Sequence, residues 1–113
     1  MTVRSKALKY TQNLSTTSAV VYTASSGETV LVKRVVIYNR HATNAATVTV
    51  SMGATAGATN NGTHLRETLQ PQTCIDREVW WVLQPGIPIS AIASANTSLT
   101  ISLYGAELEG VAD

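Results

Sequence analysis

The chain has 113 residues, of which 44% are hydrophobic and 13% are charged, and its formal net charge is +1. One domain is the natural expectation for this length, and so small a net charge gives no general attraction to nucleic acid. A single cysteine, Cys74, excludes a disulfide within the chain, and no apolar run approaches the length of a transmembrane helix. We therefore expect no nucleic-acid partner, no membrane partner, a protein made in a cytosol, and a semi-buried, unreactive thiol at Cys74.

Nearly every segment has the composition and alternation of a β-strand. The predicted strands, in chain order, span residues 7–12, 18–24, 29–39, 47–52, 64–69, 75–83, 87–94 and 98–105. Turns rich in glycine, proline and asparagine separate them. This pattern predicts an all-β fold, a single antiparallel β-sandwich of the eight-stranded jelly-roll type. We expect an N-terminal arm and first strand over 1–16, the sandwich over 17–110 and a C-terminal tail over 111–113.

Two of the strands alternate cleanly between apolar and polar residues. The apolar positions predicted to face inward on them are Val48, Val50, Met52, Leu99, Ile101 and Leu103. The strand over 29–39 breaks strict alternation, because Lys33 takes a position that the pattern reserves for an apolar residue. A β-bulge or a bend near Lys33 and Arg34 would restore the pattern.

The polar residues form no recognisable catalytic or metal-binding motif. His41 and His64 are isolated in or beside polar loops, and we read both as exposed turn histidines rather than metal ligands. We expect no catalytic residues, no cofactor and no metal.

Three carboxylates come close enough in the predicted strands to suggest a pair for glycoside hydrolysis: Glu67 with Asp76 and Glu78. Arg66 and Arg77 lie next to them in the sequence, so charge balancing on the face of a sheet is the better explanation. The sequence therefore predicts a protein that is not an enzyme.

The only two tryptophans, Trp80 and Trp81, are adjacent, and neighbours on a strand point to opposite faces. Trp81 shares the alternation of Val79 and Leu83, which places it in the core and Trp80 on the outer face with Val82. The opposite phase stays open, because a charged residue interrupts the inward side.

An indole left bare on the outer face exposes a large apolar surface. Three kinds of partner could cover this indole. One is another protein chain, in a homo-oligomer or a larger shell. The second is a sugar ring stacked on the indole, as in a carbohydrate-binding module. The third is the glycine-rich loop over 53–63 of the same chain.

The chain contains three sequence motifs, each of them once. They are a "V-K-x-V-x-I-x-N" strand, an "L-x-P-G" turn leading into an "I-x-A-x-A-S" strand, and a final "V/I-x-G-x-E" strand. The matching residues are Val32, Lys33, Val35, Ile37, Asn39, Leu83, Pro85, Gly86, Ile89, Ala91, Ala93, Ser94, Leu103, Gly105 and Glu107. In these motifs, over roughly residues 18–109, the chain resembles small β-sandwich structural proteins of tailed-phage virions.

The resemblance implies a bacteriophage capsid decoration or cement protein that stabilises the head by binding between major capsid subunits. Such proteins are often homotrimers on the capsid surface, and neck or tail-fibre components are the alternative location. The resemblance carries over no catalytic residues. We predict that a basic N-terminal arm and the outer tryptophan make the contacts with other subunits. The predicted interface residues are Val3, Arg4, Lys6, Lys9, Trp80 and Val82.

Overall fold

The computed structural model describes residues 2–53 and 62–109, which form eight strands. These strands are β1 (Thr2–Asn13), β2 (Ala19–Thr23), β3 (Glu28–Asn39), β4 (Ala46–Met52), β5 (Gly62–Leu69), β6 (Cys74–Leu83), β7 (Pro88–Ala93) and β8 (Leu99–Glu109). All eight predicted strands are present. The first and last are longer than predicted, because β1 already begins at Thr2 and β8 continues to Glu109.

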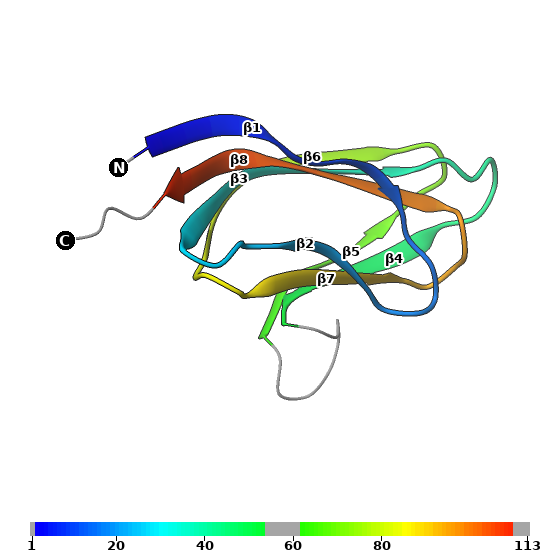
Figure 1. Cartoon of the computed structure of the whole chain (residues 1–113). Coiled ribbons are helices and arrows are strands. Elements are labelled where there is room, and N and C mark those ends of the chain that lie inside the picture. The colour runs from blue at the N-terminus through cyan, green and yellow to red at the C-terminus, as the bar shows by residue number, and fades with distance from the viewer. Residues whose placement is uncertain (1, 54–61, 110–113) are drawn as a thin grey trace.

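The strands form two four-stranded sheets that pack face to face (Figure 1). The first sheet has the order β1-β8-β3-β6 and the second has the order β2-β7-β4-β5, and every ladder is antiparallel. Apart from the β4–β5 hairpin, each strand is followed by one in the other sheet. This order is that of a jelly roll, so the predicted β-sandwich is confirmed. Because Thr2 pairs with Glu109, β1 begins and β8 ends at the same end of the molecule.

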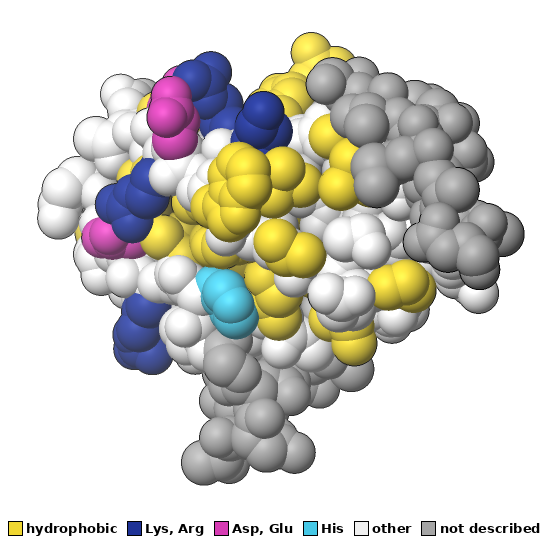
Figure 2. Space-filling model, turned by 90° about the vertical axis from the view of Figure 1, so that its left-hand side faces the viewer, with side chains coloured by type: hydrophobic (Ala, Val, Ile, Leu, Met, Phe, Trp, Pro, Cys, Tyr) yellow, Lys and Arg dark blue, Asp and Glu magenta, His cyan; other side chains and the backbone are white. Residues whose placement is uncertain are grey.

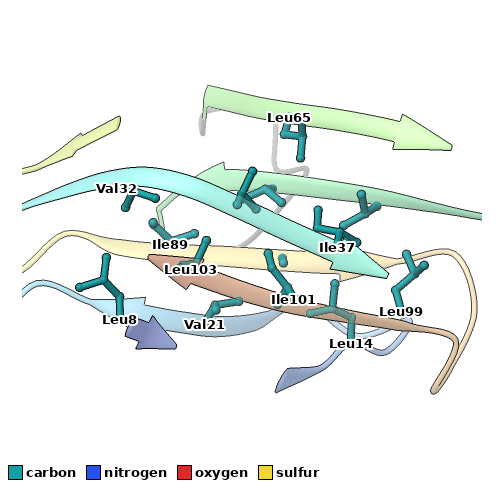
Figure 3. Close-up of a cluster of buried hydrophobic side chains, with 14 of the residues drawn as sticks. Leu8, Leu14, Val21, Val32, Ile37, Leu65, Ile89, Leu99, Ile101 and Leu103 are labelled. Atoms are coloured by element: carbon teal, nitrogen blue, oxygen red, sulfur yellow. The ribbon is translucent and has the colours of Figure 1, made fainter. Parts of the chain in front are cut away.

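The core lies between the two sheets and consists almost entirely of aliphatic side chains (Figure 3). Every second residue of a regular strand points inward, and β3, β4, β7 and β8 each contribute three or more of these side chains. The largest fully buried ones are Leu14, Ile37, Leu69, Leu83, Ile89, Leu99, Ile101 and Leu103. Burying each of them contributes roughly 1.5–3 kcal/mol. The inward positions predicted on β4 and β8 are confirmed, with Met52 half-buried against the cluster.

The predicted irregularity in β3 is present at the expected position. The register shifts between Val32 and Arg34 against both neighbouring strands, β6 and β8. Val32 and Val35 are both buried, whereas Lys33 and Arg34 are both exposed. Two consecutive side chains on one face are the mark of a β-bulge, which here sends both basic residues to the outer face of the first sheet.

Gly105 faces this bulge from β8, and the two backbones approach closely there. A Cβ atom on Gly105 would overlap the carbonyl oxygen of Leu31 and would lie 3.1 Å from the Cα atom of Val32. Glycine is therefore the residue that lets β8 stay paired with β3 across the bulge.

A buried asparagine joins three segments at the other end of β3. The amide nitrogen Nδ2 of Asn39 donates to the carbonyl oxygens of Asn44 (3.0 Å), Leu69 (3.0 Å) and Gln70 (3.3 Å). Its Oδ1 accepts from the backbone N–H of His41 at 3.0 Å. One fully buried side chain thus ties the end of β3 to the following loop and to the β5–β6 turn. This explains why the "V-K-x-V-x-I-x-N" strand ends in asparagine.

One polar contact crosses between the sheets near the start of β3. The hydroxyl of Tyr22, on β2, donates to Oε2 of Glu107, on β8, at 2.5 Å. Glu107 is buried, so this bond satisfies one oxygen of a carboxylate that water reaches poorly.

Candidate functional site

The side chains of the two tryptophans, both on β6, point to opposite faces of the first sheet. Trp81 is half-buried against the core, and its ring meets the ring of His64 edge-on, with centroids 5.7 Å apart and planes at 77°. Trp80 is 71% exposed. The predicted assignment is therefore confirmed, and the outer face of β6 carries a large bare indole.

Trp80 lines a shallow open groove on the outer face of the first sheet, with a volume of about 960 Å³. We call it the outer-face groove, and it lies over the β3 bulge. Its lining residues come from β3, β6 and β8: Lys33, Arg34, Val36, Asp76, Glu78, Val79, Trp80, Tyr104 and Gly105. Gly105 has no side chain to fill the space, and the bulge turns Lys33 and Arg34 outward beside it.

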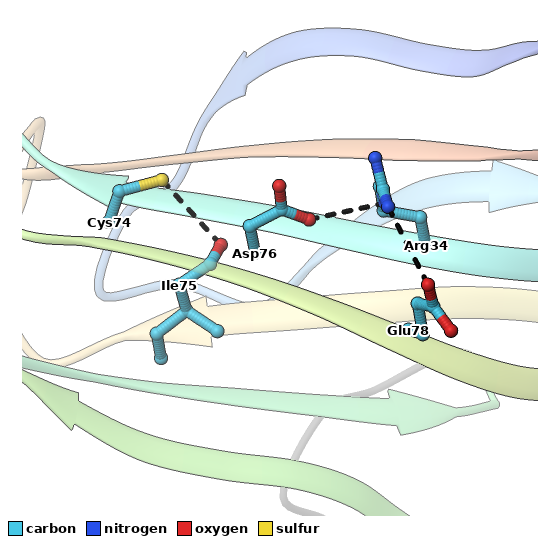
Figure 4. A network of polar contacts seen from close by, with 5 residues as sticks. All are labelled: Arg34, Cys74, Ile75, Asp76 and Glu78. Atoms are coloured by element: carbon cyan, nitrogen blue, oxygen red, sulfur yellow. Dashed lines mark hydrogen bonds and ion pairs between the residues drawn. The ribbon is translucent and has the colours of Figure 1, made fainter.

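Three of the four charged side chains of the groove, Arg34, Asp76 and Glu78, pair with one another (Figure 4). Nε of Arg34 lies 3.2 Å from Oδ1 of Asp76, and Nη2 of Arg34 lies 3.8 Å from Oε1 of Glu78. The exposed fractions of the Arg34, Asp76 and Glu78 side chains are 49%, 55% and 86%. With Lys33 included, the groove lining carries two positive and two negative groups, so its net charge is zero.

Arg34 stands at the centre of a row that crosses three strands. Its ladder partner on β8 is Tyr104, and its ladder partner on β6 is Glu78. Neighbouring strands are about 4.8 Å apart, so Tyr104 and Glu78 stand on strands about 10 Å apart. Trp80 lies two residues from Glu78 and points to the same face. The groove thus presents an indole, a phenol, a guanidinium and two carboxylates from three paired strands, at the place where their register shifts.

The third carboxylate of the sequence analysis lies elsewhere. Oε1 of Glu67, on β5, accepts from Nη2 of Arg77, on β6, at 2.8 Å, which links the open edges of the two sheets. Asp76 and Glu78 instead face outward with Arg34. Each of the three carboxylates lies beside an arginine, as charge balancing predicts, but the arginine beside Asp76 and Glu78 is Arg34 and not a neighbour in the sequence.

His41 is half-buried, not exposed as predicted. Its Nδ1 accepts from the backbone N–H groups of Thr43 (3.1 Å) and Asn44 (3.0 Å), which draws the ring onto the turn. Cys74 is exposed, not semi-buried, because strand alternation places it on the outer face with Asp76. Within the ranges 2–53 and 62–109, no three His, Cys, Asp or Glu residues are grouped so that they could hold a metal ion.

The predicted interface residues fall into two groups. Val3, Arg4, Lys6 and Lys9 belong to β1, and Trp80 and Val82 belong to β6. β1 and β6 are the two edges of the first sheet, with β8 and β3 between them. Lys9 is half-buried beside a register shift, whereas Val82 and Trp80 are exposed. No observation tests whether either group contacts another chain, so the interface stays a prediction.

Exposed hydrophobic side chains gather at the end of the sandwich where β1 begins and β8 ends (Figure 2). In this view a continuous hydrophobic patch is flanked on one side by basic and acidic side chains. The predicted covering loop lies almost wholly in residues 54–61, outside the described residues. Of the residues that the structure describes, none lies in a helix long and apolar enough to span a membrane.

Sequence reasoning found Trp80 but missed Arg34 and Tyr104 as its neighbours. The signal for Arg34 was present, because the break in alternation at Lys33 predicts two adjacent outward side chains. Nothing in the sequence alone brings Tyr104 beside them, since this requires knowing that β8 pairs with β3.

No family model matches the chain, and no curated protein matches it. Among solved structures, the chain is similar to a chain in the structure of infectious bursal disease virus Gx strain, with a TM-score of 0.50 and 10% sequence identity. The match covers 99% of this chain and 34% of that chain. A chain in the structure of the Gt strain matches with a TM-score of 0.36 and 10% identity, covering 94% of this chain and 32% of that one. This chain therefore spans about a third of the chains it matches, and the first likeness shows a shared fold.

Proposed function

We propose that this chain is a non-enzymatic structural protein of a virion, and within that class a capsid decoration or cement protein that binds between major capsid subunits. The observation that carries the proposal is the jelly roll itself. Its fold is shared over 99% of the chain with part of a chain in a virus structure. The strand motifs that resemble those of phage virion proteins occupy β3, β7 and β8 of that fold.

The edge strand β1 supplies the subunit contact in this proposal. Among the described residues, β1 forms a ladder with β8 alone, and its other side is an edge of the sheet. The ladder is regular from Thr2 to Ala7 and shifts register only beyond Ala7. A regular strand edge is a template for pairing with another chain unless something covers it. A neighbouring subunit covers it in our proposal, which agrees with the predicted contacts at Val3, Arg4 and Lys6.

The low charge of the chain supports the same proposal. Only 13% of its residues are charged, about half of the roughly 25% found in a typical soluble globular domain. A small domain whose surface is covered by copies of itself and by shell subunits needs less surface charge to stay in solution. We propose a homotrimer, the state that the phage resemblance favours.

The native mass of the purified protein tests the self-association. Size-exclusion chromatography with light scattering is expected to give three times the chain mass of 12.0 kDa. A variant that lacks residues 1–6 keeps the part of β1 that continues to Asn13, and it is expected to run as a monomer with an unchanged circular dichroism spectrum. A monomeric full-length protein contradicts the trimer. A folded, truncated trimer contradicts the contact along the edge of β1.

A further inference from the structure

We propose that the outer-face groove binds a neutral oligosaccharide, with one sugar ring stacked on the indole of Trp80. This goes beyond the proposed structural role and rests on separate observations. The groove is formed by side chains of a single chain, so the site can be tested on the purified protein whatever its place in a virion.

The exposed indole supplies the apolar platform. Trp80 is 71% exposed on β6, between Glu78 and Trp81, where the register of β6 against β3 shifts. The flat face of a pyranose ring carries C–H groups, and an indole of about 150–250 Å² matches it in size and shape. Stacking would remove from water the largest apolar side chain that the described outer face leaves bare.

The polar side chains around Trp80 can both donate and accept hydrogen bonds, as sugar hydroxyls require. A carboxylate has about four acceptor positions and a guanidinium has five N–H donors. Asp76 engages Nε of Arg34, and Glu78 lies 3.8 Å from Nη2, beyond hydrogen-bond distance. Asp76 therefore positions Arg34, while Glu78 and the remaining N–H groups of Arg34 keep acceptors and donors for a ligand. Tyr104 adds a hydroxyl group on the far side of Arg34.

The charge of the groove selects a neutral ligand. Lys33 and Arg34 balance Asp76 and Glu78, and Arg34 already pairs with both acids. An anionic ligand would have to displace the carboxylates from Arg34 or bind at Lys33 alone, in a groove that also holds Asp76 and Glu78. A cationic ligand would have to displace Arg34 from the carboxylates. An uncharged, hydroxyl-rich ligand binds without breaking either pair, since it accepts from the guanidinium and donates to the carboxylates.

The shape of the groove argues against a two-fold contact between copies of this chain at this place. A hollow is not complementary to itself, so two copies related by a two-fold axis would enclose two empty grooves against each other. In the proposed trimer the contact runs along β1, at the opposite edge of the sheet from β6, which leaves Trp80 to a ligand. The groove is open along one side and therefore contacts one face of its ligand. Binding by a single chain should then be weak, at about the millimolar level, and several copies on one particle would strengthen it by avidity.

The test uses intrinsic tryptophan fluorescence and calorimetry. The probes are short neutral oligosaccharides of glucose, mannose, galactose and N-acetylglucosamine, with sialylated and sulfated oligosaccharides beside them. At least one neutral oligosaccharide is expected to shift the tryptophan emission. Trp80→Ala should weaken its binding by about tenfold or more. Trp80→Phe, which keeps a smaller ring, should recover part of that loss but not the emission shift.

Two further variants test the polar half of the site. Glu78→Gln and Arg34→Gln remove one charge each and should weaken binding by about three- to tenfold. Tyr38→Ala is the matched control, because Tyr38 is an exposed aromatic residue of β3 that does not line the groove. It should leave binding unchanged.

Four results would overturn the proposal: no response to any neutral oligosaccharide, undiminished binding by Trp80→Ala, tighter binding of charged than of neutral sugars, or a lower native mass of Trp80→Ala. The last result would make the groove a contact between copies of the chain.

Discussion

Trp80 and Trp81 are neighbours in the chain, yet their indoles lie on opposite faces of the first sheet. Trp81 packs against the core and touches the ring of His64, while Trp80 stands in the outer-face groove. Strand alternation alone produces this division. It separates a tryptophan that stabilises the fold from one that is available for binding, and the two can be tested independently.

Replacing each tryptophan by alanine should give opposite results. Trp81→Ala removes a half-buried indole from the edge of the core and is expected to lower the free energy of unfolding by about 2 kcal/mol. Trp80→Ala removes a side chain that is mostly exposed. It should change the free energy of unfolding by less than ~0.5 kcal/mol. Urea unfolding followed by circular dichroism measures both. Equal losses would mean that Trp80 is covered by its own chain.

Gly105→Ala should destabilise the sandwich by ~2 kcal/mol or more, because the added Cβ would overlap the carbonyl oxygen of Leu31. Gly86→Ala is a useful comparison. A Cβ on Gly86 would meet nothing within 4 Å, but the φ angle of Gly86, +84°, is unfavourable for alanine. Gly86→Ala should therefore lower the free energy of unfolding by about 1 kcal/mol. Thermal and urea unfolding of the two variants should rank them in this order. A Gly105→Ala protein as stable as the parent would contradict the close approach of β8 to β3.

Asn39→Ala should cost about 3 kcal/mol of unfolding free energy, because it leaves the carbonyl groups of Asn44, Leu69 and Gln70 without their amide donor, the one at Leu69 in a buried position. The control is Asn44→Ala, since Asn44 contributes only its backbone carbonyl to this network. That variant should lose less than ~0.5 kcal/mol. Hydrogen exchange should show faster exchange at the backbone N–H of His41 in Asn39→Ala alone. Similar stability of the two variants would rule out a central role for Asn39.

Tyr22→Phe should lower the unfolding free energy by about 1–2 kcal/mol at neutral pH, because Glu107 loses a hydrogen-bond donor in a poorly solvated position. Tyr38→Phe removes the same hydroxyl from an exposed residue and should have almost no effect. Differential scanning calorimetry of both variants makes the comparison. An unchanged melting temperature for Tyr22→Phe would show that the bond between the sheets contributes nothing.

The strands were predictable because a half-buried strand repeats every two residues, and most of this chain follows that period. The bulge was predictable for the same reason, since Lys33 breaks the period in the middle of an apolar strand. The early start of β1 was not, because the residues from Thr2 to Lys6 are largely polar and gain their conformation from pairing with β8. Local pattern carries no information about that pairing.

The candidate site was only half predictable for the same physical reason. Trp80 and its neighbours on β6 share a face by alternation, which is local. Arg34 and Tyr104 join them through ladders between strands that are far apart in the sequence. The exposure of Cys74 and the turn contacts of His41 likewise depend on details at strand ends, where a shift of one residue reverses the face.

The most direct test of the central claim, a structural role in a virion, is to find the protein in the particle. Particles from the source cells would be purified on a density gradient and probed with an antibody raised against the recombinant chain. A structural role in a virion predicts that the chain sediments with the intact particles, at a constant ratio to the main shell protein across the particle peak. A chain that stays with the soluble proteins at the top of the gradient, while the shell protein sediments, would contradict it.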